Sequence, residues 1–421
     1  PNADRIAREG MIFRSAYSNG PNCAPSRACL MSGLYSPRHG IYTVANSDRG
    51  KASLRKIIPT KNTTVLADEF VTMAEALKAG GYTTATMGKW HLGKDPTTQG
   101  FDINIAGREW GSPSGGGYHS PYKYPNLVNK QKGEYLTDRL GNEAAKFIEA
   151  HKDKPFFLYL THYAVHTPIQ AKPELMSKYQ MKPTVDQQTN AKYAAMIESM
   201  DDSVGTVLDT LDRLKLADNT IVVFYSDNGG HAGATSNAPL RGSKGMLYEG
   251  GIRVPMAVRW PGVAAPGSVC EEPVIGIDLY PTLLEATKTK RPAKAQLDGS
   301  SLIPLLKDAE ARLFRPALYW HFPAYLQGST RRHGPFRTTP SGAVRMGDWK
   351  LIEYFDDGTL ELYNLTKDMG ETSNLAKQQP KQTARLHAML KAWRRATDAP
   401  VPTETNPQFD PEAWRKATRK R

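Results

Sequence analysis

Three short apolar runs constrain the fold most, because each has the length of a strand and helical patterns lie between or beside them. The runs are P-F-F-L-Y-L-T-H (155–162), T-I-V-V-F-Y-S-D (220–227) and V-P-M-A-V-R-W (254–260). An unbroken apolar run of this length is typical of a strand that is buried on both faces. Helical patterns cover about 189–214 and 277–287. The alternation predicts an α/β fold in which helices sandwich a large, mostly parallel sheet.

A further helix and strand precede these runs. Segment 63–81 places Leu66, Phe70, Met73 and Leu77 at helical spacing and ends in two glycines, which predicts an amphipathic helix. The next stretch, Y-T-T-A-T-M-G, has the length and composition of a short strand. The α/β pattern therefore extends toward the N-terminus.

The pattern changes in the last quarter of the chain. Strand-like runs A-L-Y-W-H-F, A-V-R-M-G-D-W-K-L-I-E-Y-F and T-L-E-L-Y-N-L are closely spaced and joined by turns such as Asp357-Gly358, and a helical pattern covers about 381–396. We therefore predict a catalytic domain over 1–310, a smaller C-terminal α+β domain with an antiparallel sheet and one helix over 311–400, and a basic tail over 401–421.

The charge balance narrows the class of partner. Lys and Arg number 55 against 42 Asp and Glu, which gives a formal net charge of +13. A basic surface favours nucleic acid, anionic membranes or acidic polysaccharides. The sequence contains no nucleic-acid-binding motif, so we expect no nucleic-acid partner. No apolar run approaches the roughly 20 residues of a membrane span. Cys23, Cys29 and Cys270 form neither a disulfide framework nor a zinc-ligand pattern.

Polar residues follow the predicted strands at the points where the strands end. In chain order they are Lys89 and His91, then His162 and His166, then Asp227 and Asn228. Ligands of α/β sheets bind outside the carboxyl ends of the strands, and oxygen ligands, cations and imidazoles together suit a hard metal and an anion. Each motif also has an ordinary structural alternative: Asp-Asn-Gly-Gly is commonly a turn, Lys89 and His91 suit a solvated loop, and His162 suits a hydrogen-bonded core position.

The stretch C-A-P-S-R (23–27) places a thiol at the expected N-terminus of a helix. It matches the C-x-P-S-R signature of the sulfatases, the type I family of the alkaline phosphatase superfamily. P-N-A-D-R-I-A-R-E-G-M-I-F resembles the helix and strand before that signature, and G-Y-T-T-A-T-M-G-K-W-H-L-G is similar to the second family motif. H-T-P, S-D-N-G-G and L-R-G-S-K-G-M-L-Y-E-G-G-I-R-V-P follow in the order of the later motifs, so the resemblance covers nearly the whole chain.

This resemblance implies that a maturation enzyme oxidises Cys23 to formylglycine, whose hydrated aldehyde is the nucleophile. A plain serine could form the sulfate ester but would have no comparable route to release it. By motif match, Arg27 and His91 would hold the hydrate. Lys89 and Lys244 would neutralise the sulfate oxygens.

The resemblance also implies a contact to the sulfate or leaving group and a metal site. His166, in H-T-P, is the first candidate for the contact, and His162 is the second. Asp227 and Asn228, with residue 23, would bind Ca²⁺, in preference to Mg²⁺. Two residues besides position 23 give calcium too few protein oxygens.

The sulfatases carry an acidic pair at the end of a first strand, and this pair would lie upstream of Pro1. Asp201-Asp202 lies within a predicted helix and resembles the family's ordinary helix surface, so it is no substitute. We therefore expect the natural protein to extend upstream with a buried strand that ends in two acidic residues. An export signal before it would place the protein in the periplasm or outside the cell.

The resemblance predicts a sulfuric ester hydrolase of the arylsulfatase-like type that acts on a sulfated carbohydrate. One alternative is a phosphonate or phosphate ester hydrolase of the same superfamily. Another is a non-catalytic binding protein on a sulfatase scaffold. The intact C-A-P-S-R opposes the binding protein, and the expected truncation before Pro1 favours it.

Overall fold

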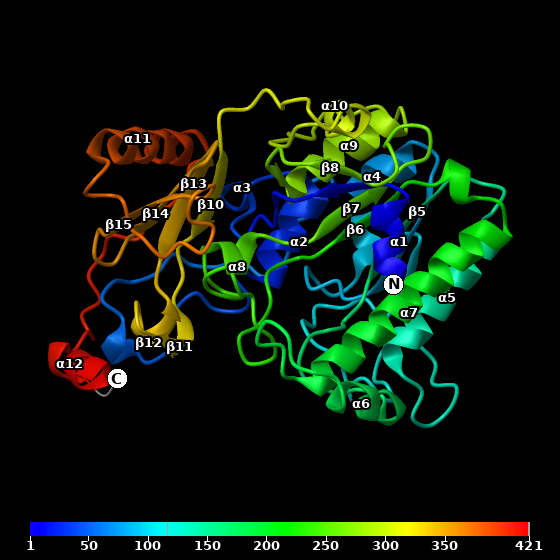
Figure 1. Ribbon diagram of the computed structural model, residues 1–421, viewed down its shortest axis with the longest axis horizontal. Coiled ribbons are helices and arrows are strands. Elements are labelled where there is room, and N and C mark those ends of the chain that lie inside the picture. Colours follow the sequence, from blue (N-terminus) through cyan, green and yellow to red (C-terminus); the bar gives the residue numbers. More distant parts are fainter. Residues whose placement is uncertain (116, 420–421) are drawn as a thin grey trace.

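A computed structural model describes residues 1–115 and 117–419, and it has an α/β architecture with a second, smaller sheet (Figure 1). A parallel sheet has β3 between β4 and β5, with Thr86 opposite both Asn104 and Tyr159. The bounds are β3 (Thr83–Gly88), β4 (Ile103–Ile105) and β5 (Phe156–Thr161). The strand expected after Gly80 and Gly81 is therefore β3, in the middle of this sheet.

A mixed sheet has the order β6-β7-β1-β8. Strand β7 runs antiparallel to both β6 and β1, whereas β1 and β8 are parallel. Strands β2 and β9, which follow β1 and β8 in the chain, form a separate short parallel pair. The bounds are β1 (Met11–Phe13), β2 (Ala16–Tyr17), β6 (Val222–Tyr225), β7 (Met256–Arg259), β8 (Ser268–Cys270) and β9 (Val274–Ile275). The α/β class is confirmed, and β7 is the exception to the mostly parallel arrangement.

Helices cover both sides of these sheets, and α5 and α7 run side by side along one edge of the molecule (Figure 1). The helices before the C-terminal sheet are α1 (Asn2–Arg8), α2 (Cys23–Ser32), α3 (Ser36–His39), α4 (Met73–Ala79), α5 (Leu136–Ala150), α6 (Pro173–Gln180), α7 (Ala191–Arg213), α8 (Glu249–Ile252), α9 (Leu279–Ala286) and α10 (Ile303–Lys307). Short 3-10 helices are η1 (Ala52–Leu54), η2 (Pro96–Gln99), η3 (Ala217–Asn219) and η4 (Gly276–Asp278). Among the described helices, none is long and apolar enough to cross a membrane.

The helix predicted over 63–81 is shorter than its apolar spacing indicates. It begins at Met73, because the Thr72 hydroxyl accepts a hydrogen bond from the Glu75 amide and the Thr72 amide donates one to the Glu75 carboxylate. This reciprocal cap satisfies two amide groups and fixes the start of the helix. Leu66 lies before the helix and is still buried, so its apolar character reflects the core and not the helix.

Two of the three strands predicted to be buried on both faces are half-buried. Strand β7 is fully buried, but β5 from Phe156 to Leu160 and all of β6 are partly exposed. Each of the two lies at the edge of its sheet in the part of the chain that the structure describes, and both border a cavity of about 910 Å³. We call this the central cavity. Its apolar lining includes Ile6, Met31, Phe157, Tyr159, Leu208 and Val223.

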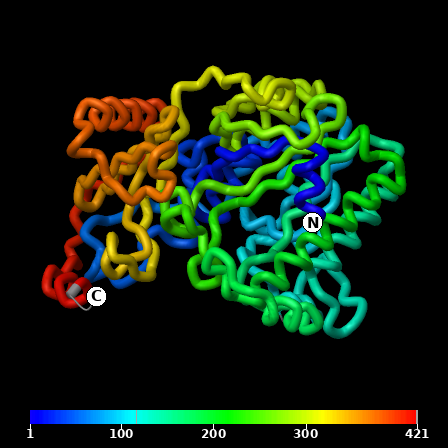
Figure 2. The backbone as a smooth tube through the Cα atoms, in the orientation of Figure 1, coloured from blue at the N-terminus to red at the C-terminus, as the bar shows by residue number. Residues whose placement is uncertain are grey.

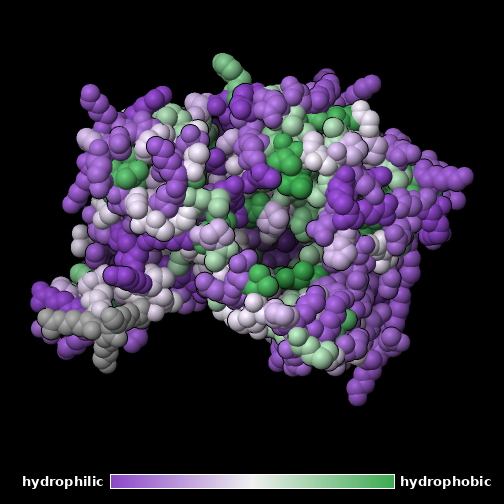
Figure 3. All heavy atoms as spheres, viewed as in Figure 1, coloured by the Kyte–Doolittle hydropathy of each residue, from purple (hydrophilic) through white to green (hydrophobic). Residues whose placement is uncertain are grey.

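The space-filling view shows the larger part of the molecule hollowed near its middle, with hydrophobic side chains gathered around the opening (Figure 3). The cavity explains the error in the burial prediction. An apolar run shows that a strand avoids water, but it does not show which neighbour covers each face.

The C-terminal region forms an antiparallel sheet of order β10-β13-β14-β15, with α11 against it (Figure 1). A separate hairpin, β11-β12, projects from this sheet. The bounds are β10 (Leu318–Phe322), β11 (Leu326–Thr330), β12 (Gly334–Thr338), β13 (Ser341–Met346), β14 (Trp349–Tyr354), β15 (Leu360–Asn364), α11 (Pro380–Ala396) and α12 (Pro411–Arg419). The predicted C-terminal antiparallel sheet is confirmed. Helix α12 lies within the segment expected to be a basic tail, and its Trp414 ring contacts Phe336.

A buried ionic cluster joins the two parts of the molecule. Lys350 of β14 lies with its Nζ atom 2.9 Å from Oε1 of Glu249 in α8 and 2.9 Å from Oε1 of Glu371. All three side chains are 0% exposed. Tyr17 donates a further hydrogen bond of 2.6 Å to Oε2 of Glu249. The cluster therefore fixes α8, and the loop before it, against the C-terminal sheet.

Candidate active site

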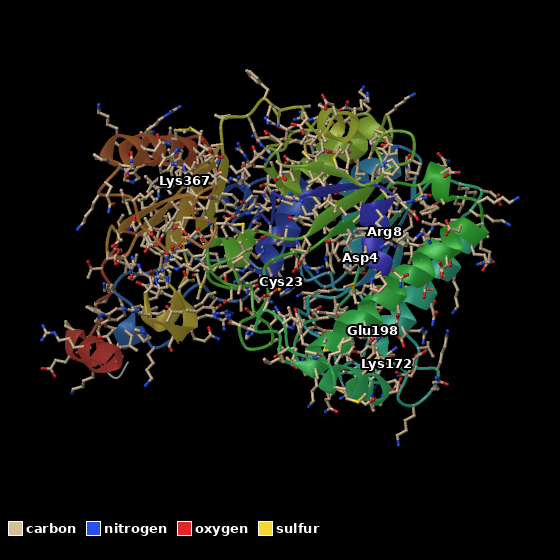
Figure 4. All side chains as sticks on the ribbon, in the orientation of Figure 1. Asp4, Arg8, Cys23, Lys172, Glu198 and Lys367 are labelled. Carbon is tan, nitrogen blue, oxygen red and sulfur yellow. The ribbon has the colours of Figure 1, made fainter. Side chains whose placement is uncertain are left out.

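The candidate site is centred on Cys23, the first residue of α2. Every residue of this helix is buried, and Cys23 is 2% exposed. The helix begins after Asn22, which has extended backbone, and ends at Gly33 in the left-handed conformation. A helix N-terminus carries a partial positive charge, so an anion at residue 23 is favoured by the backbone itself. Figure 4 shows Cys23 near the middle of the molecule, and this residue lines the central cavity.

Arg27 lies one turn along α2 and joins three segments that are distant in sequence. Its Nε atom donates a hydrogen bond of 2.8 Å to Oδ2 of Asp227, which follows β6. Its Nη1 atom donates to the carbonyl oxygen of Lys89, which follows β3. Arg27 is 7% exposed. Burial opposes its charge, but Asp227 and Cys23 outweigh this effect and raise the pKa of Arg27.

Lys89 and His91 follow β3 because the chain makes a close approach at Gly88. A Cβ atom at Gly88, whose φ is +105°, would lie 2.0 Å from the carbonyl oxygen of Thr161 in β5. The turn buries Lys89, which is 3% exposed. His91 has a φ of +67°, which is rare for a residue with a side chain, and its amide donates a 2.8 Å hydrogen bond to the carbonyl oxygen of Arg108. Strained backbone of this kind is common at functional sites.

The two histidines after β5 face different surroundings. The Nδ1 atom of His166 lies 2.8 Å from the carbonyl oxygen of Thr167, so that nitrogen carries the proton of the bond. The other side of the ring is then free to bond Cys23, and this hydrogen bond lowers the pKa of the thiol. The Nε2 atom of His162 instead lies 3.1 Å from Oγ of Ser203 in α7, and burial lowers the pKa of His162 to about 4. His162 therefore has the hydrogen-bonded position that was its structural alternative.

Lys244 comes from the loop before α8. Its Nζ atom donates a hydrogen bond of 3.1 Å to Sγ of Cys23. The neighbouring Gly245 amide donates a 2.8 Å hydrogen bond to the carbonyl oxygen of Pro21, which fixes this loop against the segment before α2. The backbone hydrogen bond between Gly245 and Pro21 therefore holds Lys244 close to Cys23.

The electrostatic environment of residue 23 favours an anion. Burial raises the pKa of the Cys23 thiol, but Lys89, Lys244, His166 and His91 together lower it well below its ordinary value. Burial lowers the pKa of Lys89, and the charges of Cys23 and Asp227 partly oppose that effect. Burial also lowers the pKa of His91. A low-dielectric pocket with several cations strengthens each interaction with a bound anion.

Asp227 and Asn228 do not complete a calcium site with the residues present. Oδ1 of Asn228 is buried and has no hydrogen-bond partner, which suits a cation ligand. Oδ2 of Asp227 is already bonded to Arg27. No group of three or more His, Cys, Asp or Glu side chains able to hold a metal occurs among the described residues. Calcium takes six to eight oxygens, so this donor set does not fit calcium, and we assign no step to a metal.

Asp201 has a structural role that the sequence did not indicate. It is 7% exposed, and its carboxylate accepts hydrogen bonds of 2.8 Å from the backbone amides of Asn2 and Ala3. It therefore satisfies the first amides of α1 and supplies a favourable negative charge there. The expected surface position in α7 is wrong, whereas the conclusion that Asp201 does not replace the acidic pair is unaffected.

Sequence reasoning missed a second group of basic residues next to the site. His231 ends the same S-D-N-G-G-H stretch as Asp227, and burial, Arg337, Lys244 and His166 all lower its pKa. Arg337 belongs to β12, and its Nη1 atom donates a 3.4 Å hydrogen bond to the carbonyl oxygen of Lys244. The position of His231 six residues after the strand could have suggested it. Arg337 gave no local signal.

Comparison with known proteins identifies the family. The sequence matches the family model described as Sulfatase over residues 1–289. The chain belongs to the sulfatase family. It also matches the model described as N-sulphoglucosamine sulphohydrolase, C-terminal, over residues 243–396. The resemblance inferred from C-A-P-S-R and the later motifs is therefore confirmed, and the chain is a sulfuric ester hydrolase by family.

Individual relatives extend over most of this sulfatase. A protein named Sulfatase from Formosa agariphila is 34% identical, with 95% of this chain and 84% of the relative covered. An N-acetylgalactosamine-6-sulfatase from Homo sapiens is 32% identical, with 79% of this chain and 66% of the relative covered. The crystal structure of Ps i-CgsB in complex with k-i-k-neocarrahexaose is similar with a TM-score of 0.78 at 28% identity, and the match covers 99% of this chain and 91% of that one.

Proposed function

We propose that this sulfatase hydrolyses a sulfate monoester of a carbohydrate at residue 23, once Cys23 has been converted to formylglycine. The observation that carries the proposal is the charge around Cys23. Two lysines and two imidazoles face a buried sulfur and stabilise negative charge on it. In this reading, Sγ of Cys23 stands in for the oxygens of the hydrated aldehyde. A site that stabilises an anion there suits both an ionised hydroxyl and a sulfate group.

The residues of the chain divide the remaining work. The hydrated formylglycine supplies the attacking oxygen and a second hydroxyl through which sulfate is released. Lys89 and Lys244 neutralise the sulfate oxygens, since both act directly on residue 23. Arg27 holds the ends of β3 and β6 together around the nucleophile. His166 is placed to exchange a proton with the leaving group, because its Nδ1 atom is fixed by the Thr167 carbonyl.

Three observations support a carbohydrate substrate. One relative is named an N-acetylgalactosamine-6-sulfatase, and the similar structure of Ps i-CgsB contains k-i-k-neocarrahexaose. The net charge of +13 also suits a polyanion. A steryl-sulfatase from Rattus norvegicus is 30% identical, and such a substrate would gain little from a basic surface. The phosphonate monoester hydrolase of Agrobacterium radiobacter is 20% identical with a TM-score of 0.67, which shows a shared fold only.

Mass spectrometry of the tryptic peptide 15–27 tests the chemistry of residue 23. The protein is produced together with a formylglycine-generating enzyme, and position 23 should lose the mass that separates a thiol from an aldehyde. Cys29, six residues along α2, is the matched internal control and should remain a thiol. An unmodified Cys23 under these conditions would instead support a binding protein. Faster release of phosphate than of sulfate from paired nitrophenyl esters would favour the phosphonate and phosphate hydrolases.

We also propose that the protein is exported to the periplasm or the medium. Two substrate properties support this: sulfated polysaccharides are large, and their charge prevents passage through a membrane. Fractionation of the source cells, with activity or antibody detection, tests the location. Recovery of the protein from the cytoplasm alone would contradict it.

A further inference from the structure

Two half-buried arginines lie next to the site, and neither has a carboxylate partner among the described residues. Nη1 of Arg337 donates to the carbonyl oxygen of Lys244. Nη1 of Arg49 donates a 3.2 Å hydrogen bond to the carbonyl oxygen of Val44, and its Nε atom is buried without a partner. Neither side chain forms an ion pair with an acidic residue in the part of the chain that the structure describes. Both are half-buried, so solvent satisfies them only in part.

The fold brings these arginines together from separate parts of the chain. Arg337 lies on hairpin β11-β12, whereas Arg49 lies on the segment before η1, which runs from the larger part of the molecule to the smaller one (Figure 2). Gly50 packs on the hairpin so closely that a Cβ atom there would lie 2.6 Å from Cε1 of Phe336. Asp48 also forms a β-bridge with Tyr325. The two arginines are therefore held in place by their neighbours.

The same contacts connect the arginines to residue 23. A Cβ atom at Gly245 would lie 3.0 Å from Cδ of Arg337, so the arginine packs directly on the backbone beside Lys244. Lys244 in turn bonds Cys23 through its Nζ atom. Arg337 bonds the backbone of Lys244, and the side chain of Lys244 bonds Cys23, so this one lysine lies between the Arg337 guanidinium and the nucleophile.

Among the described residues, no acidic side chain forms an ion pair with Arg49, Arg337 or His231. Burial lowers the pKa of Arg337, and burial together with Arg337 lowers the pKa of Arg49. Burial and the charges of Arg337 and Lys244 also lower the pKa of His231. Desolvated like charges oppose one another, and a bound anion would relieve both the repulsion and the unsatisfied donors. A guanidinium also offers a planar pair of donors that matches sulfate and carboxylate oxygens.

We propose that Arg49 and Arg337 form a second anion-binding subsite that takes another sulfate or a carboxylate of the same substrate. The proposal rests on the proposed function, because it assumes that residue 23 receives one sulfate ester. It assigns the substrate to carbohydrates with two anionic groups on the same or adjacent sugar units. Esters with a single charge would leave the arginines unpaired.

Calorimetric titration of the full chain tests this subsite without requiring turnover. The probes are one disaccharide with a single sulfate, one with two sulfates, and one with a sulfate and a carboxylate. Arg49→Gln and Arg337→Gln should each reduce the preference for a doubly charged probe by about 10-fold or more, as expected for loss of a charge-assisted hydrogen bond. Arg331→Gln is the matched control, because Arg331 is exposed and lies in the same hairpin. It should keep the original preference.

The outcomes separate this inference from the proposed function. If both Gln variants keep the original preference, the subsite is wrong, even if sulfate is released. If the preference depends on the arginines but residue 23 is never converted, the subsite stands and the proposed hydrolysis fails. Comparison of the two doubly charged probes identifies sulfate or carboxylate as the second group. Should Arg49→Gln fail to fold, Arg49→Lys keeps the charge and removes the planar donors, so it should also lose preference.

Discussion

Replacing Lys350 with Met should destabilise the protein by about 2 kcal/mol more at pH 9 than at pH 7. Without Lys350, Glu249 keeps its hydrogen bond from Tyr17 and a cation, Arg253, at 3.6 Å. Glu371 is the carboxylate left without a cation. Burial already raises the pKa of Glu371 from 4.5 to about 7, even with Lys350 present. Glu371 of the wild-type protein is therefore about half protonated at pH 7, and loss of Lys350 should raise its pKa further, so that the variant folds with Glu371 protonated at higher pH as well.

The magnitude follows from the cost of that proton. An unfolded glutamate ionises near pH 4.5, so keeping Glu371 protonated in the folded state costs about 1.4 kcal/mol for each pH unit above that value. In the wild type this cost stops rising once the pH passes the folded pKa of about 7, whereas in the variant it continues to rise toward pH 9. The sign is that of a raised pKa: stability is present at low pH and is lost as the pH rises above 4.5. Urea unfolding followed by circular dichroism at both pH values measures the loss. Lys367→Met, at an exposed position in the same region, is the control.

Two results would refute this account of the cluster. One is an equal loss of stability at pH 7 and pH 9. The other is a loss below about 1 kcal/mol at pH 9, because removing one partner of a buried pair is normally costly. The double variant Lys350→Met with Glu371→Gln should recover much of the loss at pH 9, since no ionisable carboxylate is then left without a partner.

Two further predictions concern acid stability and metal binding. Burial lowers the pKa of His333 to about 3, so His333 folds as the neutral form and the protein loses stability as the pH falls below 6.5. Between pH 7 and pH 5, the unfolding free energy of His333→Leu should therefore fall by about 2 kcal/mol less than that of the wild type, as measured by urea unfolding. An unchanged decrease would contradict this. Calcium should bind residues 1–421 with a dissociation constant of about 1 mM or weaker in calorimetry, because Asp227 and Asn228 supply too few oxygens. Micromolar binding that Asp227→Asn removes would show that this site is complete.

The local parts of the site could be predicted because strand ends are local features. Lys89 and His166 each follow a recognisable strand, and the parallel pairing of β3 with β5 brings the two carboxyl ends to one edge of the sheet. The histidines after β5 show the limit of this rule. His162 and His166 are four residues apart, yet one contacts α7 and the other Cys23, because the chain turns between them. Their catalytic roles remain predictions.

Contacts between distant segments could not be predicted in the same way. Arg337 reaches the site only because hairpin β11-β12 packs against the loop of Lys244, and no periodicity records that contact. The start of α4 is different, since Thr72 and Glu75 have the spacing of a reciprocal cap. The apolar periodicity predicted too long a helix, because Leu66 is apolar to pack in the core although it lies before the helix. Capping residues were the better signal there.

The open edges of β5 and β6 affect how the chain behaves in concentrated solution. Each edge presents backbone N–H and C=O groups that no strand of the described chain pairs, next to partly exposed aromatic and branched side chains. Unpaired edges of this kind are templates for strand addition from another molecule. The net charge of +13 keeps molecules apart at low ionic strength, and salt screens that repulsion. Solubility should therefore fall as ionic strength rises. The salt concentrations that weaken binding of an anionic substrate are also those at which the edges of β5 and β6 along the central cavity are most able to pair with another molecule.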